Sequence, residues 1–378
     1  MKALNLLLTG LAAVCLLSSC GGESDESGIS GISELIPLYD GDTFVYIDTK
    51  GEVAIIPEVE VVETSLFREE YALVGIETDD GRRYGFLDTK GKLAIPAKYI
   101  RATTFSEGLA WVVEPDKAPA AIDRSGKEVF SMPDAKTVEF FSDGLAKFGQ
   151  EDEKGNTLYG FVDKKGKVVI KPDYPIAQWF SNGLSNVSTD KQEVGYINKK
   201  GKMVIAEQFA EAIVFTPEGY ASVKTSEGHG VIDKKGSYVI NPQYAQYIKI
   251  DRGDFIVKEG GKIGIIDKDG KVIVPMDFKD IYPFQGRNYT SATMDGRTYG
   301  FIDREGKFII NPQFEYVVAF IGDVAVVAMA DKVGIVNEKG EYIFNPIKVT
   351  AETLCFDLLG LSVNVTPHPY YSEVGTAK

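Results

Sequence analysis

The chain has 378 residues, with 55 acidic side chains against 41 lysines and arginines, and a formal net charge of −14. Proteins bind nucleic acid through basic patches that displace counterions, so this composition argues against nucleic acid as a partner. Three cysteines and two histidines are too few to indicate a disulfide framework or a histidine-rich zinc site.

The N-terminus has the pattern of a bacterial signal peptide. An apolar run from Ala3 to Leu17 follows Lys2, and it is shorter than the ~20 residues that a membrane-spanning helix needs. It ends at Leu17-Ser18-Ser19-Cys20, which resembles the lipobox of bacterial lipoproteins. The resemblance implies that residues 1–19 are removed and that the Cys20 thiol is acylated, which attaches the protein to a membrane without spanning it.

Residues 20–34 are expected to form a lipid-anchored flexible stalk, because Gly21 to Gly28 is polar, acidic and rich in glycine and serine. This stretch also resembles the acidic export signal that sends some lipoproteins of Gram-negative gut bacteria to the cell surface. The resemblance implies an outer-membrane or cell-surface location. Loss of Lys2 with the signal peptide leaves 40 basic against 55 acidic side chains, a formal charge of −15. Cys355 then has no partner for an intramolecular disulfide, and we expect it to be buried and inert.

One pattern returns nine times along the rest of the chain. An Asp or Asn anchor is followed three residues later by glycine, and successive anchors are 34 to 40 residues apart. The pattern predicts a hairpin turn, because the carboxylate can accept backbone N–H bonds and glycine can take the left-handed conformation that closes the loop. The turn residues are Asp88, Gly91, Asp163, Gly166, Asp233, Gly236, Asp303 and Gly306, with further anchors at Asp48, Asp123, Asn198, Asp267 and Asn337.

Each anchor lies between two predicted strands, and the second strand is expected to end at a proline, which cannot donate to a ladder. These prolines are Pro57, Pro96, Pro172, Pro242, Pro275, Pro312 and Pro346. A third strand ending in an aromatic residue, a turn and a fourth strand follow, as in Phe105–Ala110, Phe141–Ala146 and Phe180–Leu184. Each unit is therefore a four-stranded antiparallel meander. Helical structure is expected only in 351–360, as a short helix or an irregular cap.

The alternation of an aromatic-Gly-Phe/Tyr-Ile-Asp-x-x-Gly-Lys hairpin with a Phe-Ser-Glu-Gly-Leu-Ala segment resembles the WG-repeat family, also called KWG repeats. The tryptophan that names the family is replaced by Tyr84, Tyr159 and Tyr299, and by His229 in a unit that departs further. The resemblance covers about Leu35 to Ile347. It implies a β-rich interaction array and no known reaction.

The predicted organisation is an all-β repeat domain over 35–348 and a C-terminal cap or tail over 349–378. A repeat unit cannot bury both of its faces alone, so neighbouring units must stack. Radial stacking of four-stranded meanders gives a β-propeller, which typically closes with about 4 to 8 blades. The sequence therefore predicts nine propeller-like blades, in a closed, open or spiral array, with a β-hairpin solenoid as the alternative.

No linear catalytic motif is present, and we expect no enzymatic activity, cofactor or metal. His229 occupies the position of Tyr84 and is expected to pack, and His368 lies in the tail. Asp267–Lys271 lacks the bidentate glutamate of a calcium-binding loop, since Phe278 stands at that position. The repeated acids fill the same turn position in unit after unit, where they bind backbone.

Two features indicate where a ligand could bind. Trp111 and Trp179 are possible ligand contacts, since aromatic rings stack on sugars and anchor protein partners, with core packing as the alternative for both. Insertions at Thr78–Arg83 and Gln150–Leu158 fall in one class of loop, and equivalent loops of a repeat protein lie on one face. The face that carries these loops is therefore the predicted binding face.

The function favoured by the sequence is a non-catalytic envelope or cell-surface lipoprotein that acts as a protein-binding or scaffolding module. The alternative is a glycan-binding component of a surface nutrient-uptake system, which predicts a cluster of exposed tryptophan and tyrosine. A carboxylate-based hydrolase is a third reading, which predicts a deep acidic pocket. The expected partners are the membrane, through the lipid, and an envelope protein or glycan.

Overall fold

The computed structural model describes residues 34–39, 43–190, 192–246, 248–330, 332–348 and 362–364. The predicted signal peptide, Cys20, the predicted cap at 351–360, Cys355 and His368 lie outside these residues. The described part contains no helix that is long and apolar enough to span a membrane.

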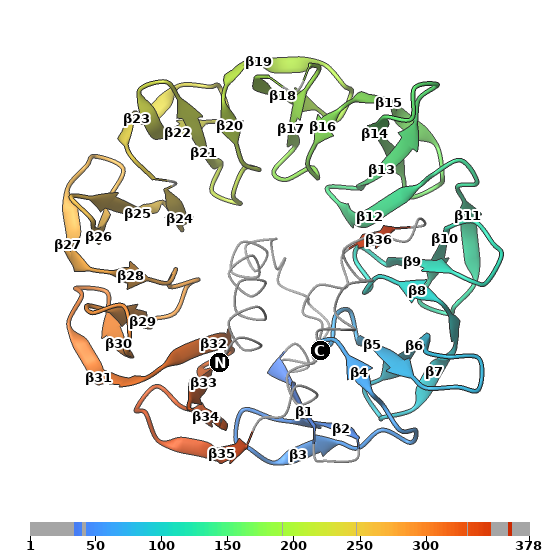
Figure 1. The fold of residues 1–378 in the computed structure, drawn as a ribbon, viewed down its shortest axis with the longest axis horizontal. Helices are drawn as coiled ribbons and strands as arrows, with labels where there is room; N and C mark the ends of the chain where they lie inside the picture. Colours follow the sequence, from blue (N-terminus) through green and yellow to red (C-terminus); the bar gives the residue numbers. More distant parts are fainter. Residues whose placement is uncertain are drawn as a thin grey trace, which may run out of the picture.

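Nine antiparallel sheets stand around a common centre as the blades of a β-propeller, and successive blades are neighbours in the ring (Figure 1). We number the blades 1 to 9 in chain order and call their strand positions a to d from the centre outward. Blades 2 to 9 each have a four-stranded meander at positions a to d, and blade 1 has described strands at b, c and d. The predicted nine-unit propeller is confirmed, and the β-hairpin solenoid is not formed.

Positions a and b form the inner half of each blade. Position a holds β4 (Glu63–Thr64), β8 (Arg101–Ala102), β12 (Thr137–Ser142), β16 (Ile176–Ala177), β20 (Glu211–Ala212), β24 (Lys249–Asp251), β28 (Asp280–Ile281) and β32 (Tyr316–Ile321). Position b holds β1 (Ile36–Tyr39), β5 (Tyr71–Ile76), β9 (Leu109–Val113), β13 (Leu145–Glu151), β17 (Leu184–Ser188), β21 (Tyr220–Thr225), β25 (Asp254–Glu259), β29 (Tyr289–Thr293) and β33 (Val324–Met329).

Positions c and d, in the outer half of the blade, have a described strand in every blade. Position c holds β2 (Phe44–Ile47), β6 (Arg83–Asp88), β10 (Ala120–Asp123), β14 (Thr157–Asp163), β18 (Val194–Asn198), β22 (Gly228–Asp233), β26 (Lys262–Ile266), β30 (Tyr299–Asp303) and β34 (Lys332–Val336). Position d holds β3 (Val53–Ile55), β7 (Leu93–Tyr99), β11 (Glu128–Ser131), β15 (Val168–Tyr174), β19 (Met203–Phe209), β23 (Tyr238–Tyr244), β27 (Val272–Phe278), β31 (Phe308–Phe314) and β35 (Tyr342–Lys348).

The prediction that the outer strands end at proline was wrong for six blades. In β7, Pro96 lies in the middle of the strand, and the register to β6 shifts between the pairs Tyr84–Tyr99 and Phe86–Ile95. The outer edge of β7 has no partner strand, so the missing N–H of proline is tolerated there. The same arrangement occurs at Pro172, Pro242, Pro275, Pro312 and Pro346.

The glycine of the aromatic-Gly pair is required by this bulge. A Cβ on Gly85 would lie 2.7 Å from the Ile95 carbonyl oxygen and 2.8 Å from the Ala97 nitrogen. The outer strand can therefore approach strand c only where strand c has no side chain. Equivalent backbone crowding surrounds Gly160, Gly195, Gly230, Gly264 and Gly300.

The hydrophobic core lies between the blades. Leu109, Trp111 and Val113 of blade 3 alternate along β9 and pack against blade 4, where Val138 and Phe148 are among the buried partners. The same kind of contact closes the ring, because Ile36 and Leu38 of blade 1 share a cluster with Val326 and Ile335 of blade 9. No described strand is shared between these two blades. The ring is therefore closed by side-chain packing.

A fifth strand joins blade 4. β36 (Ser362–Asn364) pairs antiparallel with β12 on the inner edge of that sheet. The C-terminal part of the chain thus contributes to a blade from its central side.

Candidate functional site

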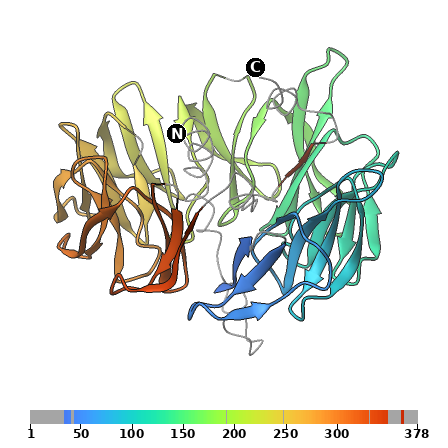
Figure 2. The same cartoon turned by 60° about the horizontal axis from the view of Figure 1, so that its bottom comes forward.

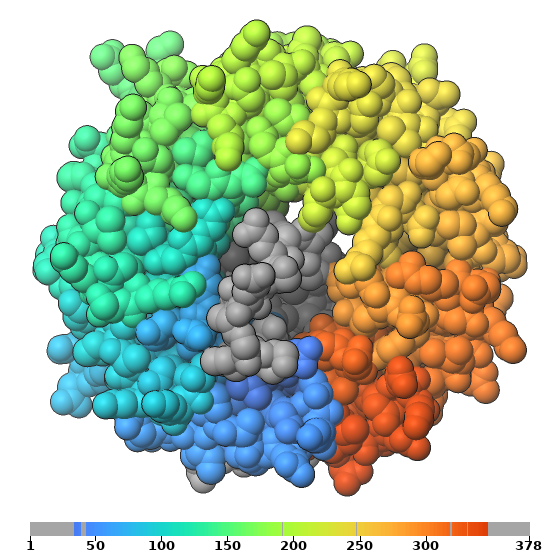
Figure 3. Space-filling model, turned by 180° about the vertical axis from the view of Figure 1, so that it is seen from behind, coloured from blue at the N-terminus to red at the C-terminus, as the bar shows by residue number. Residues whose placement is uncertain are grey.

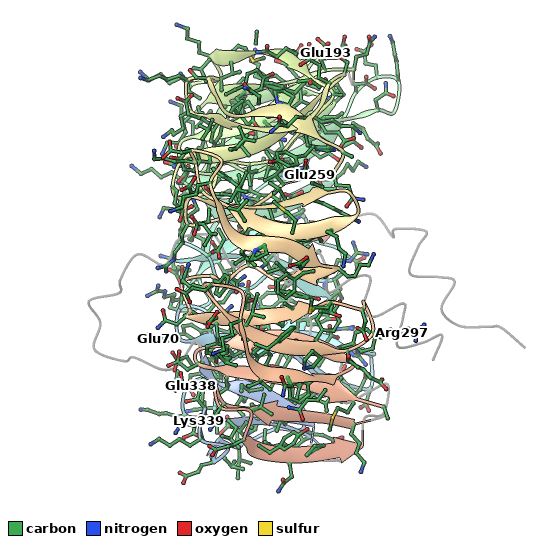
Figure 4. All side chains as sticks on the ribbon, turned by 90° about the vertical axis from the view of Figure 1, so that its left-hand side faces the viewer. Glu70, Glu193, Glu259, Arg297, Glu338 and Lys339 are labelled. Carbon is green, nitrogen blue, oxygen red and sulfur yellow. The ribbon has the colours of Figure 1, made fainter. Side chains whose placement is uncertain are left out.

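The meander places its connections on two opposite faces of the ring. The a–b and c–d turns lie on one face, which we call the turn face, and the b–c loops lie on the other, which we call the loop face. Seen edge-on, Glu70, Glu338 and Lys339 project from one side, and Glu193 and Arg297 from the other (Figure 4). The loop face is uppermost in Figure 2, and Figure 3 looks onto the turn face.

The c–d turns have the geometry that the Asp-x-x-Gly pattern predicts. In blade 2, Oδ1 of Asp88 accepts the backbone N–H groups of Lys90 at 2.9 Å and Lys92 at 3.0 Å, and Gly91 has a φ of 79°. The other turn pairs, Asp163 with Gly166, Asp233 with Gly236 and Asp303 with Gly306, have the same bonds to the second and fourth residues after the acid. These acids organise backbone.

The a–b turns of blades 3 to 5 are each joined to the following blade through the serine of the Phe-Ser-x-Gly segment. Ser106 Oγ donates to the Phe141 carbonyl oxygen at 2.6 Å, and Ser142 Oγ donates to that of Phe180 at 2.7 Å. Ser181 continues the series to Phe215. Each serine reaches the aromatic residue at the same position of the following blade.

The acid of the same segment forms a second bond between blades. Oε2 of Glu69 accepts the N–H of Gly108 at 2.8 Å and lies 3.0 Å from Nη2 of Arg124. Glu107 accepts the N–H of Gly144 at 2.9 Å, and Lys164 Nζ lies 3.8 Å from its carboxylate. We call these serine and acid bonds the inter-blade staples. These bonds could not be predicted from local sequence patterns, because their partners are about 35 to 40 residues apart.

An open hollow of about 1010 Å³ lies over these staples on the turn face of blades 2 to 5. Carboxylates and cations alternate around it. The Ser125 hydroxyl, which donates to Asp123, holds the pKa of that carboxyl below its usual value. The lining residues are Glu69, Glu107, Gly108, Asp123, Arg124, Ser125, Asp143, Gly144, Lys164 and Lys199.

Neither tryptophan lines this hollow. Trp111 is fully buried, stacks on Phe141 and donates from Nε1 to the Glu139 carbonyl oxygen at 2.9 Å, so it belongs to the core and we do not retain it as a ligand contact. Trp179 is half-buried beside Phe140. His229 is 8% exposed, and burial lowers its pKa. Within the described residues, no group of three or more His, Cys, Asp or Glu could hold a metal ion.

The loop face carries charged groups that the sequence analysis missed. In blade 2, the Tyr84 hydroxyl donates to Oε2 of Glu63 at 3.0 Å, and Arg82 lies 2.8 Å from the same oxygen. In blade 4, Lys147 Nζ lies 2.7 Å from Glu139 and 4.9 Å from the centre of the Tyr159 ring. An aromatic residue, a carboxylate and a cation therefore meet in both blades.

Blades 6 and 8 repeat this combination with other residues. Glu211 and Lys224 form an ion pair at 2.5 Å, and their charges act on His229. Lys249 of blade 7 reaches Asp280 of blade 8 at 3.3 Å, and burial beside Asp280 raises the pKa of Tyr299 to about 12. One sequence feature could have revealed these groups. It is an aromatic residue before the glycine of the aromatic-Gly motif, combined with an acid in the strand at position a of the same blade.

Both insertions noted in the sequence lie on the loop face. The insertion in blade 4 extends β13 and β14 and ends in a second Asp-x-x-Gly turn, in which Asp152 Oδ1 accepts the N–H groups of Lys154 and Asn156, each at 2.8 Å. The insertion in blade 2 is closed by a bond of 2.6 Å from Thr78 Oγ1 to the Gly81 carbonyl oxygen. The b–c loops on this face thus vary in length from blade to blade.

Replacing Glu107 with alanine tests the inter-blade staples. The change removes the acceptor of the Gly144 N–H group and the partner of Lys164, and a hydrogen bond to a charged group contributes about 1.5 to 3 kcal/mol. Because Glu107 keeps part of its contact with water, we expect a loss of about 1.5 kcal/mol in the free energy of unfolding, measured in urea. Glu153→Ala, at an exposed loop tip, is the control and should leave stability unchanged; equal losses would contradict the staple.

Comparison with protein families finds the WG containing repeat at five positions, residues 84–117, 159–191, 195–227, 263–297 and 299–332. All five segments begin at or within strand c of one blade, as the matches at 84 and 159 show, and run through strand b of the next. The chain therefore carries WG-containing repeats. A comparison with curated proteins gave no match.

Solved structures with similar folds share little sequence with this chain. The dihydro-heme d1 dehydrogenase NirN, in complex with DHE, is 14% identical, with a TM-score of 0.46 over 82% of this chain and 77% of that one. A eukaryotic initiation factor is 12% identical, with a TM-score of 0.43 over 74% and 96%. BamB from Moraxella catarrhalis is 11% identical, with a TM-score of 0.35 over 82% and 94%.

Proposed function

We propose that this propeller with WG-containing repeats is a non-catalytic envelope lipoprotein that binds another protein and holds it at a membrane surface. Acyl chains on Cys20 would supply the attachment, since two or more chains give stable anchoring. The proposed location is the bacterial outer membrane or the cell surface.

The observation that carries this proposal is the difference between the two faces. The repeated serines and acids of the turn face bind the neighbouring blade, as Ser106 and Glu107 do. The b–c loops of the loop face differ in length and charge, and bonds to a neighbouring blade are not repeated along them as on the turn face, although Glu114 of blade 3 pairs with Lys98 of blade 2 at 2.7 Å. Insertions on one face of a repeat protein often mark its binding face. This supports the loop face as the surface that contacts the partner.

The absence of catalysis is part of the proposal, and the turn-face hollow supports it. A general acid needs a carboxyl that stays protonated, in a site that excludes water. Asp123 is held in its ionised form by hydrogen bonds, and Glu69 and Glu107 bind backbone N–H groups and cations in the open hollow. A wide, open surface with mixed charges is better suited to a protein partner.

Exposed aromatic residues give little support to glycan capture. The large hydrophobic side chains that are well exposed in the described chain include two aromatic ones, Tyr238 and Tyr342. They lie in the outer strands of blades 6 and 9, so they do not form the cluster on one face that a sugar-binding platform requires.

The test is a binding screen of the mature chain, residues 21–378, against envelope-protein fractions and a glycan panel, read by thermal shift. Glu153 and Glu193 are exposed on the loop face, and their replacement by lysine should weaken the binding of a stabilising protein at least tenfold. Glu305→Lys with Glu338→Lys makes the same charge change on the turn face and is the matched control. Stabilisation by glycans alone, or a loss confined to the control, would overturn the proposal.

A further inference from the structure

The cations of the c–d turns on blades 2 to 6 fall into two groups. In blades 3 to 6, the first residue after each anchor folds back onto the preceding blade and reinforces the staples. Its contacts are Arg124 with Glu69 at 3.0 Å, Lys164 with the Glu107 carbonyl oxygen at 3.1 Å, Lys199 with that of Asp143 at 2.9 Å and Lys234 with Asn182 Oδ1 at 3.1 Å.

The second group consists of lysines that lie further along the same turns, in blades 2 to 6. All are exposed, and none forms an ion pair within 4.0 Å with any residue that the structure describes. These turns contain no acid besides the anchor. We call the group the basic arc: Lys90, Lys92, Lys127, Lys165, Lys167, Lys200, Lys202 and Lys235.

The other c–d turns carry additional acids beside their cations. In blades 1, 7, 8 and 9 these acids are Glu52, Asp269, Glu305, Glu338 and Glu341. On the loop face, Glu193 and Glu259 are exposed (Figure 4). In an acidic protein, the basic arc is therefore the region best suited to approach an anionic surface.

Exposed apolar side chains begin the outer strands of most blades, Val272 and Ile309 outside the arc included, and within the arc they lie beside its lysines. There they directly follow the lysine turns of blades 4 to 6: Val168 is 43% exposed, Val169 38%, Val204 44% and Tyr238 43%. Cations combined with apolar side chains suit the boundary between lipid headgroups and acyl chains.

The stalk also reaches the turn face. Glu34 lies against the a–b turn of blade 9, since a Cβ on Gly322 would be 2.9 Å from its carboxyl carbon. Cys20 is 14 residues earlier in the sequence. At a maximum of about 3.3 to 3.6 Å per residue, this length extends no more than ~50 Å. A lipid on Cys20 would therefore hold the point where Glu34 meets the turn face within about 50 Å of the membrane.

We propose that the basic arc docks the turn face on the phosphate groups of anionic membrane lipids, so that the loop face points away from the membrane. The inference rests on the membrane attachment of the proposed function. All eight cations of the arc are lysines, which act as point charges and lack the planar fork with which arginine grips a single phosphate. Such charges suit a fluid layer of headgroups. Docking thereby leaves the varied loops available to the protein partner.

The test uses the unacylated mature chain, residues 21–378, with vesicles of phosphatidylcholine that contain or lack phosphatidylglycerol. At low salt the chain should sediment with the anionic vesicles only, and at about 1 M salt, where the Debye length is about 3 Å, it should be released. Replacing Lys165, Lys200 and Lys235 with glutamine should weaken the binding by about 100-fold, since each lysine near an anionic membrane contributes about fivefold.

The matched control removes three lysines from the other half of the turn face, Lys50, Lys271 and Lys339, and should bind as the unmodified chain does. Equal losses in both variants, equal binding to neutral vesicles, or no binding to anionic vesicles would overturn the docking. Arc-dependent binding of polyglutamate without binding to vesicles would assign the arc to an acidic protein instead. If docking fails while Cys20 is acylated in cells and the loop-face partner still binds, the proposed scaffold function stands.

Discussion

Replacing Gly300 with alanine is expected to lower the free energy of unfolding by about 3 kcal/mol, at the upper end of what overpacking usually costs. The added Cβ would lie 2.4 Å from the Ile310 carbonyl oxygen and 2.7 Å from the Pro312 nitrogen. These atoms belong to the bulged outer strand, so relief requires that strand to move away from its partner. Urea unfolding of residues 21–378 measures the effect.

The control for Gly300→Ala is Gly155→Ala in the blade 4 loop. Gly155 has a φ of 78°, and nothing lies within 4 Å of a Cβ built there, so only the left-handed conformation opposes alanine. We expect a loss of about 1 kcal/mol. If Gly300→Ala were no more damaging than this control, the close approach of strands c and d would not be what requires glycine in the aromatic-Gly motif.

Truncation of Ile36 to alanine is expected to loosen the ring at its closure. Ile36 is 1% exposed and belongs to the cluster that joins blades 1 and 9. Removing buried methyl groups costs about 2 to 5 kcal/mol, and these two blades share no described strand that could hold them together. Hydrogen exchange should therefore speed up first in β1, β2 and β33, before the other blades are affected.

Ile302→Ala is the matched control for this experiment, because Ile302 is fully buried in the cluster between blades 7 and 8. The loss of stability should be similar. The closure between blades 1 and 9 should keep its protection in this variant. Uniform exchange around the ring in both variants would show that the closure is as strong as the other interfaces.

The number and type of the repeats could be read from the sequence, because their signals are local. Asp88 and Gly91 specify a turn within four residues, and the same spacing at nine positions corresponds to nine blades. The closure of the ring could not be derived in this way. It depends on contacts such as those of Ile36 with blade 9, which bring together residues about 300 positions apart.

The candidate sites were predicted less completely. Trp111 could be a surface platform or a core residue on sequence grounds, and its burial became clear only when blade 4 was in place. The proline rule failed because an edge strand does not need its outer N–H groups, and the sequence does not reveal which strands lie at an edge. The basic arc was also hidden, because its lysines come from five turns that lie far apart in the sequence of an acidic chain.

The prolines of the outer strands oppose edge-to-edge pairing between neighbouring copies of the protein. The proposed lipid anchor would concentrate copies in two dimensions, and the outer strand edges of the blades begin with exposed residues such as Val168 or Val272. Flat edges of this kind tend to join to one another and start aggregation. Pro172 and Pro275 interrupt the row of donors within these strands, and the bulge bends the edge out of line. The ring can thus be packed densely on a surface and remain a separate molecule.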